Sequence, residues 1–330
     1  MSTQEGPPQV GGANRDGRST VLHWSADDGL RLSGRMWPAV SQGTRNGGFG
    51  QGRKQKDEAP TLLCLPGLSR NTRDFNDIAS FVQARGTRVI ALDYRGRGLS
   101  AWDDDWSHYS LEMESSDIEA GLRDLQVGRF AILGTSRGGL HAMAMAARFK
   151  PGRITGVILN DIGPNIEPAS LSRIAQSIGK RMEFESASDL ALRIAADLGD
   201  QFTSLSQAEW VKLAHQLGEA GGDGKFRLSY DPALAKTLTE WEDPGKAPPS
   251  PDLWPLFEAL KPLPLLVVRG GNSDLLSDAT CAEMKRRHEN CDVLTIPDQG
   301  HAPLLWDSAA QETIQAFLSQ LAETTETKDF

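Results

Sequence analysis

The chain is 330 residues long and carries a formal net charge of −9, with 39% hydrophobic and 24% charged residues. This composition supports a sizeable core and argues against wholesale disorder. The acidic balance argues against a nucleic acid or an anionic membrane as partner, because no basic field would draw the protein there. Its cysteines (Cys64, Cys281 and Cys291) are too few and too scattered for a disulfide framework or a zinc site. We expect neither a metal nor another cofactor.

Two segments are predicted to lack regular secondary structure. Residues 1–19 cannot bury enough apolar surface to offset the entropic cost of ordering the chain, so we predict that they form a flexible tail. Residues 1–18 also lack the apolar core of a signal peptide, and we therefore expect a cytoplasmic protein. Residues 41–58 are rich in Gly, Lys and Arg without periodicity, which predicts a long, mobile surface loop.

The rest of the chain predicts an α/β architecture. Residues 21–24 and 31–37 alternate apolar with polar side chains around Asp28-Gly29, a pattern typical of a β-hairpin. Short runs of Val, Ile and Leu follow, and they suit strands buried on both faces of a parallel sheet: 61–65, 88–92, 130–133, 154–159, 265–268 and 293–296. Amphipathic segments lie between them at 74–84, 111–125, 137–149 and 278–288. This alternation predicts a doubly wound fold.

One long insertion interrupts the alternation. Residues 162–261 contain no strong strand pattern, and four stretches are helical in pattern: 171–178, 187–198, 207–217 and 232–241. An insert of this length predicts a separate subdomain, which residues 242–251 close as a linker. The core is then predicted to comprise residues 20–161 and 262–325.

The sharpest motif is Gly134-Thr135-Ser136-Arg137-Gly138, at the junction of an apolar strand and a helical stretch. A nucleophilic serine needs a turn sharp enough to lift its hydroxyl clear of the sheet, and flanking glycines let the neighbouring backbone pass. The helix that follows directs N–H groups at the site, where they favour developing negative charge. We therefore predict that Ser136 is a nucleophile.

A serine nucleophile needs a base and an acid that orients the base. His301 follows the last predicted strand, at the sheet edge where open α/β folds bind ligands. Asp274 and Asp161 both follow strands and both fit the chain order serine, acid, histidine. We favour Asp274, because its loop is the usual origin of the acid, and keep Asp161 as the alternative acid or a supporting residue. Away from His301, His108 and His141 are candidates for supporting roles.

Arg137 is an unusual polar residue directly after a nucleophile. We hypothesise that Asp161 pairs with Arg137, which would avoid a buried unpaired charge. The backbone N–H of Arg137 is a predicted oxyanion donor, and Leu68, in the loop Leu65-Pro66-Gly67-Leu68, is predicted to supply the second.

Taken in order, these motifs resemble the α/β-hydrolase superfamily, and in particular bacterial esterase-like serine hydrolases. The resemblance rests on the 65–68 loop, on Asp93-Tyr94-Arg95-Gly96-Arg97-Gly98-Leu99-Ser100, on the serine turn, on the Asp274 loop and on Gly300-His301-Ala302-Pro303. It implies an eight-stranded, mostly parallel sheet, with the insert after the sixth strand acting as a helical lid. A serine in place of aspartate at the turn excludes the dehalogenase and epoxide hydrolase chemistries of this fold.

The predicted activity is hydrolysis of a small or medium carboxylic ester or lactone by two-step acyl transfer. Two alternatives stay open: a C–C bond hydrolase of diketones or ring-cleavage products, and a hydrolase-derived ligand receptor with little turnover. The expected partner is thus a small molecule. Four aromatic side chains near the predicted site loops are candidates for the substrate pocket: Trp102, Trp106, Tyr109 and Trp306.

Overall fold

The computed structural model describes residues 19–40, 61–239 and 252–326. The predicted N-terminal tail, the 41–58 loop and the 242–251 linker therefore lie, except for residue 19, outside the described residues. None of the described helices is long and apolar enough to cross a bilayer.

An eight-stranded sheet forms the centre of the molecule, in the order β1-β2-β4-β3-β5-β6-β10-β11. Its strands are β1 (Thr20–Ser25), β2 (Arg31–Trp37), β3 (Thr61–Leu65), β4 (Val89–Asp93), β5 (Phe130–Thr135), β6 (Ile154–Asn160), β10 (Leu265–Gly270) and β11 (Cys291–Ile296). β2 is antiparallel to both β1 and β4, as the predicted hairpin requires, and the other neighbouring strands are parallel to each other. Every residue of β3 and β4 is buried, in accord with their continuous apolar sequences. The predicted mostly parallel sheet is confirmed.

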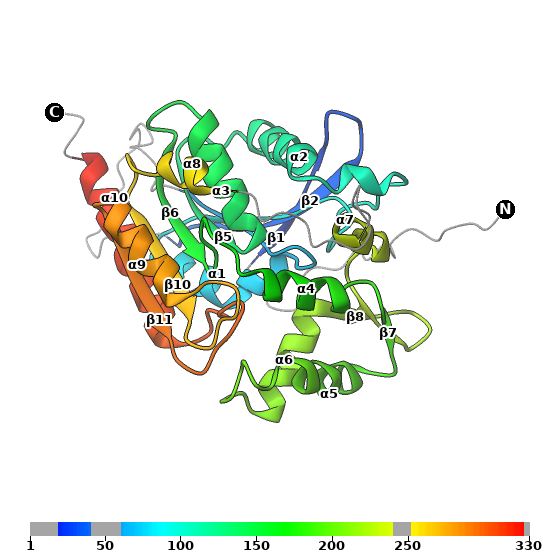
Figure 1. Ribbon diagram of the computed structural model, residues 1–330. Helices are drawn as coiled ribbons and strands as arrows, with labels where there is room; N and C mark the ends of the chain where they lie inside the picture. Colours follow the sequence, from blue (N-terminus) through cyan, green and yellow to red (C-terminus); the bar gives the residue numbers. More distant parts are fainter. Residues whose placement is uncertain (1–18, 41–60, 240–251, 327–330) are drawn as a thin grey trace, which may run out of the picture.

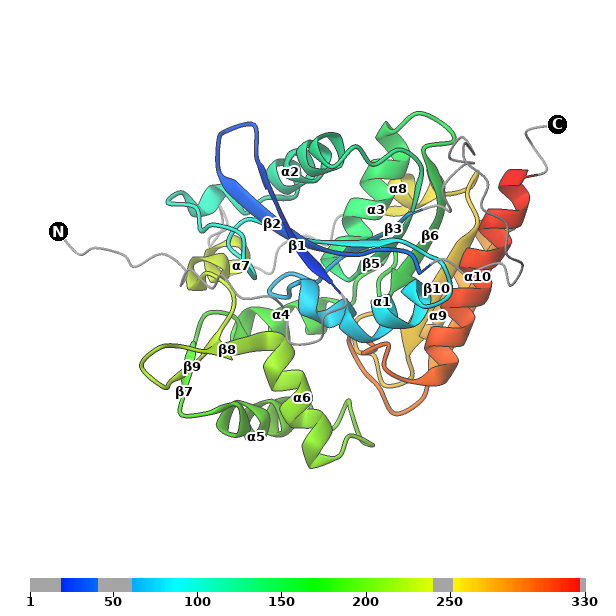
Figure 2. The ribbon, with the colours of Figure 1, turned by 180° about the vertical axis from the view of Figure 1, so that it is seen from behind.

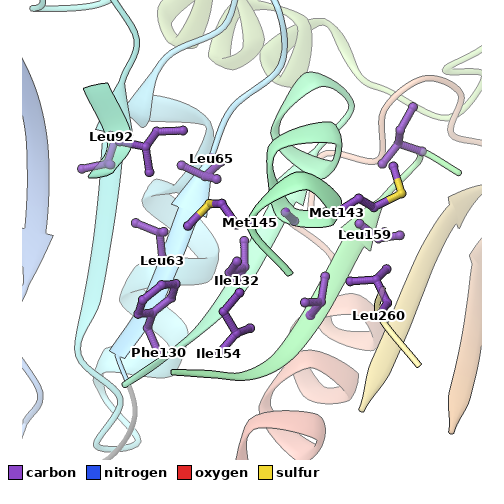
Figure 3. Close-up of a cluster of buried hydrophobic side chains, with 14 of the residues drawn as sticks. Leu63, Leu65, Leu92, Phe130, Ile132, Met143, Met145, Ile154, Leu159 and Leu260 are labelled. Carbon is purple, nitrogen blue, oxygen red and sulfur yellow. The ribbon is translucent and has the colours of Figure 1, made fainter. Parts of the chain in front are cut away.

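Helices cover both faces of this sheet, as Figures 1 and 2 show from opposite sides. One face carries α2 (Leu111–Asp124), α3 (Arg137–Arg148), α8 (Trp254–Glu258) and α9 (Asp278–Arg287). The other carries α1 (Asn76–Gln83) and α10 (Ser308–Glu326). Figure 3 shows the first core, where Met143 and Met145 of α3 pack among Leu65, Ile132 and Leu159. The helix that follows the serine turn is thereby fixed against three central strands.

The insert between β6 and β10 contains more than helices. Its elements are α4 (Pro168–Ser177), β7 (Glu183–Phe184), α5 (Ala187–Leu198), α6 (Gln207–Leu217), β8 (Gly218–Ala220), β9 (Phe226–Leu228), the 3₁₀ turn η3 (Pro232–Ala235) and α7 (Lys236–Thr239). A small sheet of order β7-β9-β8 corrects the expectation of an all-helical insert. These strands have two or three residues each, too few for a recognisable period.

The insert has its own apolar cluster, in which Phe184, Ile194 and Trp210 are buried. Figure 1 shows α5, α6 and β8 gathered at one edge of the main sheet. The predicted boundary at residue 261 is too late, because α8 packs on α3 and its Phe257 belongs to the main core. After β9 the chain also bonds to the loop that follows β4, with Gly98 N–H donating to the Ser229 carbonyl and Asp231 N–H to that of Gly96, both at 2.8 Å.

Candidate active site

Ser136 occupies a sharp turn between β5 and α3. Its φ of 50° and ψ of −112° lie outside the usual regions for a residue with a side chain. Glycines make the turn possible: a Cβ on Gly134 would collide with the Gly138 carbonyl, and one on Gly138 with Leu65. The Ser136 N–H donates to the Asn160 carbonyl of β6 at 3.0 Å. The predicted strand, turn and helix at Ser136 are therefore present.

His301 lies between a serine and a carboxylate. Its Nε2 is 2.9 Å from Ser136 Oγ, and its Nδ1 is 2.8 Å from Oδ2 of Asp161. The His301 side chain is 9% exposed, whereas Asp161 is fully buried. A carboxylate can only accept, so Nδ1 carries the proton and Nε2 accepts from the serine hydroxyl. The structure thus brings Ser136 and His301 together, as predicted.

The acid beside His301 is Asp161, which corrects the choice of Asp274. Asp161 follows β6 directly, with φ of 54°. The Gly270 N–H donates to its Oδ1 at 2.8 Å, and the Ser273 hydroxyl to its Oδ2 at 2.6 Å. These donors come from the end of β10 and the loop after it, so the loop expected to carry the acid instead supports it.

Asp274 faces the insert. Both of its carboxylate oxygens accept from Arg173 of α4, at 2.7 and 2.8 Å. Partial burial raises the pKa of Asp274, but the Arg173 guanidinium and then His301 lower it by more, so that the net shift is below its ordinary value. The adjacent ends of β6 and β10 each present a carboxylate, and a helix of the insert engages the second one.

Arg137 does not pair with Asp161, contrary to our hypothesis. Its Nε donates to Glu114 of α2 at 2.6 Å, and its Nη2 to the Tyr109 carbonyl at 3.1 Å. Glu114 also accepts from His141 at 3.1 Å. The supporting role considered for His141 therefore has a structural basis, whereas no pattern in the sequence pointed to Glu114.

The loop after β3 reaches the serine. A Cβ placed on Gly67 would lie 3.9 Å from the Ser136 Cβ, so no side chain separates the two. The N–H of Leu68 has no acceptor within the described ranges. Arg137 is the first residue of α3, where a helix has no internal acceptor for its N–H. Leu68 thus borders the same cavity as Ser136, and Arg137 follows Ser136 directly.

A cavity of about 620 Å³ opens over Ser136 and His301. The insert supplies most of its apolar wall: Ile174, Ile178, Phe184, Leu190, Ile194, Leu198, Phe202, Leu213, Leu217 and Leu228. Five basic side chains also border it: Arg70, Arg173, Lys180, Arg181 and Arg193. Four of these pair with carboxylates, and Lys180 has no carboxylate partner in the described part of the chain.

None of the four predicted pocket aromatics lines this cavity. Tyr109 is buried, and its hydroxyl donates to Asp231 at 2.5 Å. Trp106 packs in the cluster around Tyr109, and Trp102 is 38% exposed. Trp306 borders a separate surface groove beside Lys212. The prediction of these four aromatics relied on their nearness in sequence to the site loops, whereas the wall of the cavity comes mostly from the insert.

Among the described residues, one group has donor atoms close enough for a metal: Asp28, Asp103 and His108. The Arg95 guanidinium already contacts Asp28 at 3.0 Å and Asp103 at 2.5 Å. The positively charged Arg95 guanidinium therefore already occupies this acidic group, and the donor set does not fit a metal ion.

Comparison with known proteins identifies a family and several relatives of this chain. The model of the alpha/beta hydrolase family matches residues 62–316. A 3-hydroxybutyrate-oligomer hydrolase of Cupriavidus necator is 34% identical over 251 residues, 75% of this chain and 84% of the relative. A 2-(acetamidomethylene)succinate hydrolase of Mesorhizobium japonicum is 26% identical over 250 residues, 75% and 84% of the two chains. An alpha/beta hydrolase structure from Novosphingobium aromaticivorans is 34% identical with a TM-score of 0.80, covering 92% of this chain and 98% of that one.

Proposed function

We propose that this chain, which belongs to the α/β-hydrolase family, is a serine hydrolase that cleaves carboxylic esters through Ser136. The family and fold implied by the sequence motifs are confirmed. The observation that carries the proposal is the continuous hydrogen-bonded series from Ser136 through His301 to Asp161. Such a series is what activates an otherwise weak hydroxyl nucleophile.

The proposed reaction is acyl transfer in two steps. His301 takes the Ser136 proton as the hydroxyl attacks the ester carbonyl, and then gives that proton to the departing alcohol. Water, deprotonated by His301, attacks the acyl-enzyme, and His301 returns this proton to Ser136 Oγ as the acid leaves. Asp161 accepts from His301 Nδ1, fixes the tautomer of His301 and stabilises its protonated form. We therefore assign the role of the acid to Asp161 and no longer to Asp274.

The negative charge on the carbonyl oxygen needs two fixed donors. We assign them to the backbone N–H groups of Leu68, in the loop after β3 that borders the same cavity as Ser136, and of Arg137, directly after Ser136. Neither group would have to reorient during the reaction, and one such donor is typically worth about 3 kcal/mol of barrier. The start of α3 adds the positive end of its dipole.

For the substrate, we propose a short ester with an apolar acyl part and a free carboxylate, such as a dimer or trimer of a 3-hydroxy acid. The apolar wall of the cavity supports the first feature, and the basic side chains at its border, Lys180 in particular, support the second. Two relatives that act, by name, on 3-hydroxybutyrate oligomers and on a substituted succinate are consistent with this choice. We also propose that the insert, described over residues 162–239, acts as a lid that selects substrates.

A cytoplasmic location is part of the same proposal. All three cysteines are free and buried, as is usual for a protein of a reducing compartment. Burial raises the pKa of the Cys281 thiol to about 11, so this thiol is not a rival nucleophile.

Labelling of Ser136 with a fluorophosphonate probe tests the nucleophile. Wild type should be labelled, Ser136→Ala should not, and Ser177→Ala should be labelled like wild type, because Ser177 borders the same cavity without a histidine partner. Unchanged labelling of Ser136→Ala would contradict the assignment.

A substrate panel tests the reaction class. It should contain p-nitrophenyl esters, a γ-lactone, a 1,3-diketone and the 3-hydroxybutyrate dimer and trimer. We expect ester hydrolysis that is fastest with the carboxylate-bearing oligomers. Cleavage of the diketone alone would favour the C–C hydrolase. Labelled enzyme without turnover of any compound would favour the receptor.

A further inference from the structure

We infer that Glu114, 22 residues before the nucleophile, is a positioning residue that holds both proposed oxyanion donors in register. This inference rests on the proposed function, because it concerns how the same site stabilises the oxyanion. Glu114 lies on α2 and is completely buried, and the proposed mechanism uses it in no step. A buried carboxylate without a chemical task needs an explanation.

Glu114 lies between two guanidinium groups. Its Oε2 accepts from Arg137 Nε at 2.6 Å, and its Oε1 is 2.8 Å from Arg97 Nη2. The second contact is a close ion pair whose angle is poor for a hydrogen bond, since neither atom has an aligned partner. Burial raises the pKa of Glu114, but Arg137 and then Arg97 outweigh burial and hold the pKa far below its usual value. This direction favours the charged carboxylate near neutral pH.

Each guanidinium is tied to one donor residue. Arg137 supplies its own backbone N–H, and Glu114 fixes the direction in which its side chain leaves α3. Arg97 donates from Nε to the Leu68 carbonyl at 2.9 Å and from Nη1 to the Arg95 carbonyl at 2.6 Å. Arg97 thereby holds the backbone of Leu68, the other donor residue. A single carboxylate thus links the loop after β3 to the first turn of α3.

Stability alone does not account for this arrangement. Taking two arginines and a carboxylate out of water costs several kcal/mol per ion, and apolar residues of similar size often serve stability equally well. The three ions also leave one net positive charge beside the site, because burial lowers the pKa of His141 and keeps that ring neutral. The effect of Glu114 on the position of the donors can therefore be distinguished from its effect on charge. Neutralising Glu114 would make the net charge beside the site more positive, and this change by itself would favour an oxyanion.

The chain contains a matched control on the same helix. Asp117, one turn after Glu114, is also buried and accepts from Arg95 at Nε and Nη2, both at 2.7 Å. None of its contacts reaches Leu68, Arg137 or Ser136 in the described residues. Asp117→Asn therefore reports the cost of neutralising a buried carboxylate on α2 without disturbing the proposed oxyanion donors.

The experiment compares Glu114→Gln with Asp117→Asn in the full-length protein. Its readouts are kcat and KM for a p-nitrophenyl ester, the inhibition constant of a trifluoromethyl ketone and the urea midpoint. We expect Glu114→Gln to lower kcat by about 10- to 100-fold, less than the loss of a whole donor, with KM changed less than about threefold. Inhibition by the ketone should weaken in parallel, because its adduct carries the oxyanion. Asp117→Asn should lose stability with kcat within about twofold of wild type.

A second variant carries the same test if Glu114→Gln does not fold. Arg137→Met keeps the backbone N–H and breaks the ion pair from its other side, so it should lower kcat and weaken ketone inhibition in the same way. If both fold, the double variant should be no slower than the slower single variant, because both changes break one connection.

A kcat that is raised, or that falls no further than in Asp117→Asn, would overturn the positioning role, as would an effect confined to KM. If wild type itself neither hydrolyses the ester nor reacts with the fluorophosphonate probe, the proposed function fails instead.

Discussion

Arg173 of α4 holds both carboxylate oxygens of Asp274, with N–O distances of 2.7 and 2.8 Å. The two side chains are about a third exposed, so the ion pair contributes only about 0–1 kcal/mol to stability. The contact has a structural consequence of another kind. It joins the insert to the loop after β10 and keeps the negative charge of Asp274 near His301 but bonded elsewhere.

Exchange of each aspartate for asparagine should separate the two carboxylates. Asp161→Asn should lower kcat by about 10³- to 10⁴-fold, because an amide no longer enforces the productive tautomer of His301. Asp274→Asn should lower kcat less than about tenfold, because its main partner is Arg173. Steady-state hydrolysis of a p-nitrophenyl ester measures both. The reverse ranking would restore Asp274 as the acid.

The wall of the cavity should control acyl length. Ile194 of α5 lines the cavity, and Ile194→Trp should reduce kcat/KM for a p-nitrophenyl octanoate at least about tenfold relative to the acetate, because the indole fills space that a long chain needs.

Leu192→Trp is the control for this change. Leu192 lies on the same helix, is 67% exposed and does not border the cavity, so the ratio of the two esters should stay as in wild type. If both variants shift the ratio alike, the cavity is not where the acyl chain binds.

His141 should make stability fall in mild acid. Burial lowers its pKa in the folded protein, whereas the unfolded chain titrates near 6.5. Below about pH 6.5 the unfolded chain binds a proton that the folded protein does not, so the free energy of unfolding decreases, by at most about 1.4 kcal/mol per pH unit, until the folded pKa is reached.

Urea unfolding between pH 8 and pH 5 measures this slope. His141→Gln should have a shallower slope, since the amide can still bond to Glu114 and Ser115 but does not titrate. A slope for His141→Gln as steep as that of wild type would contradict the lowered pKa.

The serine turn should not tolerate a methyl group at Gly138. A Cβ there would meet the Leu65 backbone of β3, so Gly138→Ala should cost about 2 kcal/mol of stability or more. Gly128→Ala is the matched change, because a Cβ at Gly128 has open space around it, and its stability should be unchanged or slightly raised. Thermal denaturation of the two variants gives the comparison, and equal midpoints would contradict the crowding at Gly138.

The sequence could predict what local patterns determine. Continuous apolar runs identified the buried strands, and Gly134 and Gly138 marked the serine turn, because close backbone packing there admits no other residue. The loop carrying His301 followed from its place after the last strand. Each of these inferences needs only the neighbouring residues and the rule that parallel strands end at one edge.

The choice between Asp161 and Asp274 depended on distant residues. Both follow strands that end side by side, and local sequence gives them equal access to His301. In the structure Asp274 pairs with Arg173, 101 positions before it, and Asp161 pairs with His301. Glu114 was missed for the same reason: its pairing with Arg97 and Arg137 appears only when α2, α3 and the loop after β4 have packed together.

The backbone bonds from Gly98 to Ser229 and from Asp231 to Gly96 limit how this enzyme can be re-engineered. They flank Arg97, so the returning end of the insert is also one wall around the residue that holds Leu68. A chimera that exchanged the whole insert for that of another hydrolase would take on the substrate specificity of that hydrolase. The same exchange would also remove this wall around Arg97. Transplants that keep residues 229–231 native, and graft only the segment before them, should retain the recipient's catalytic rate.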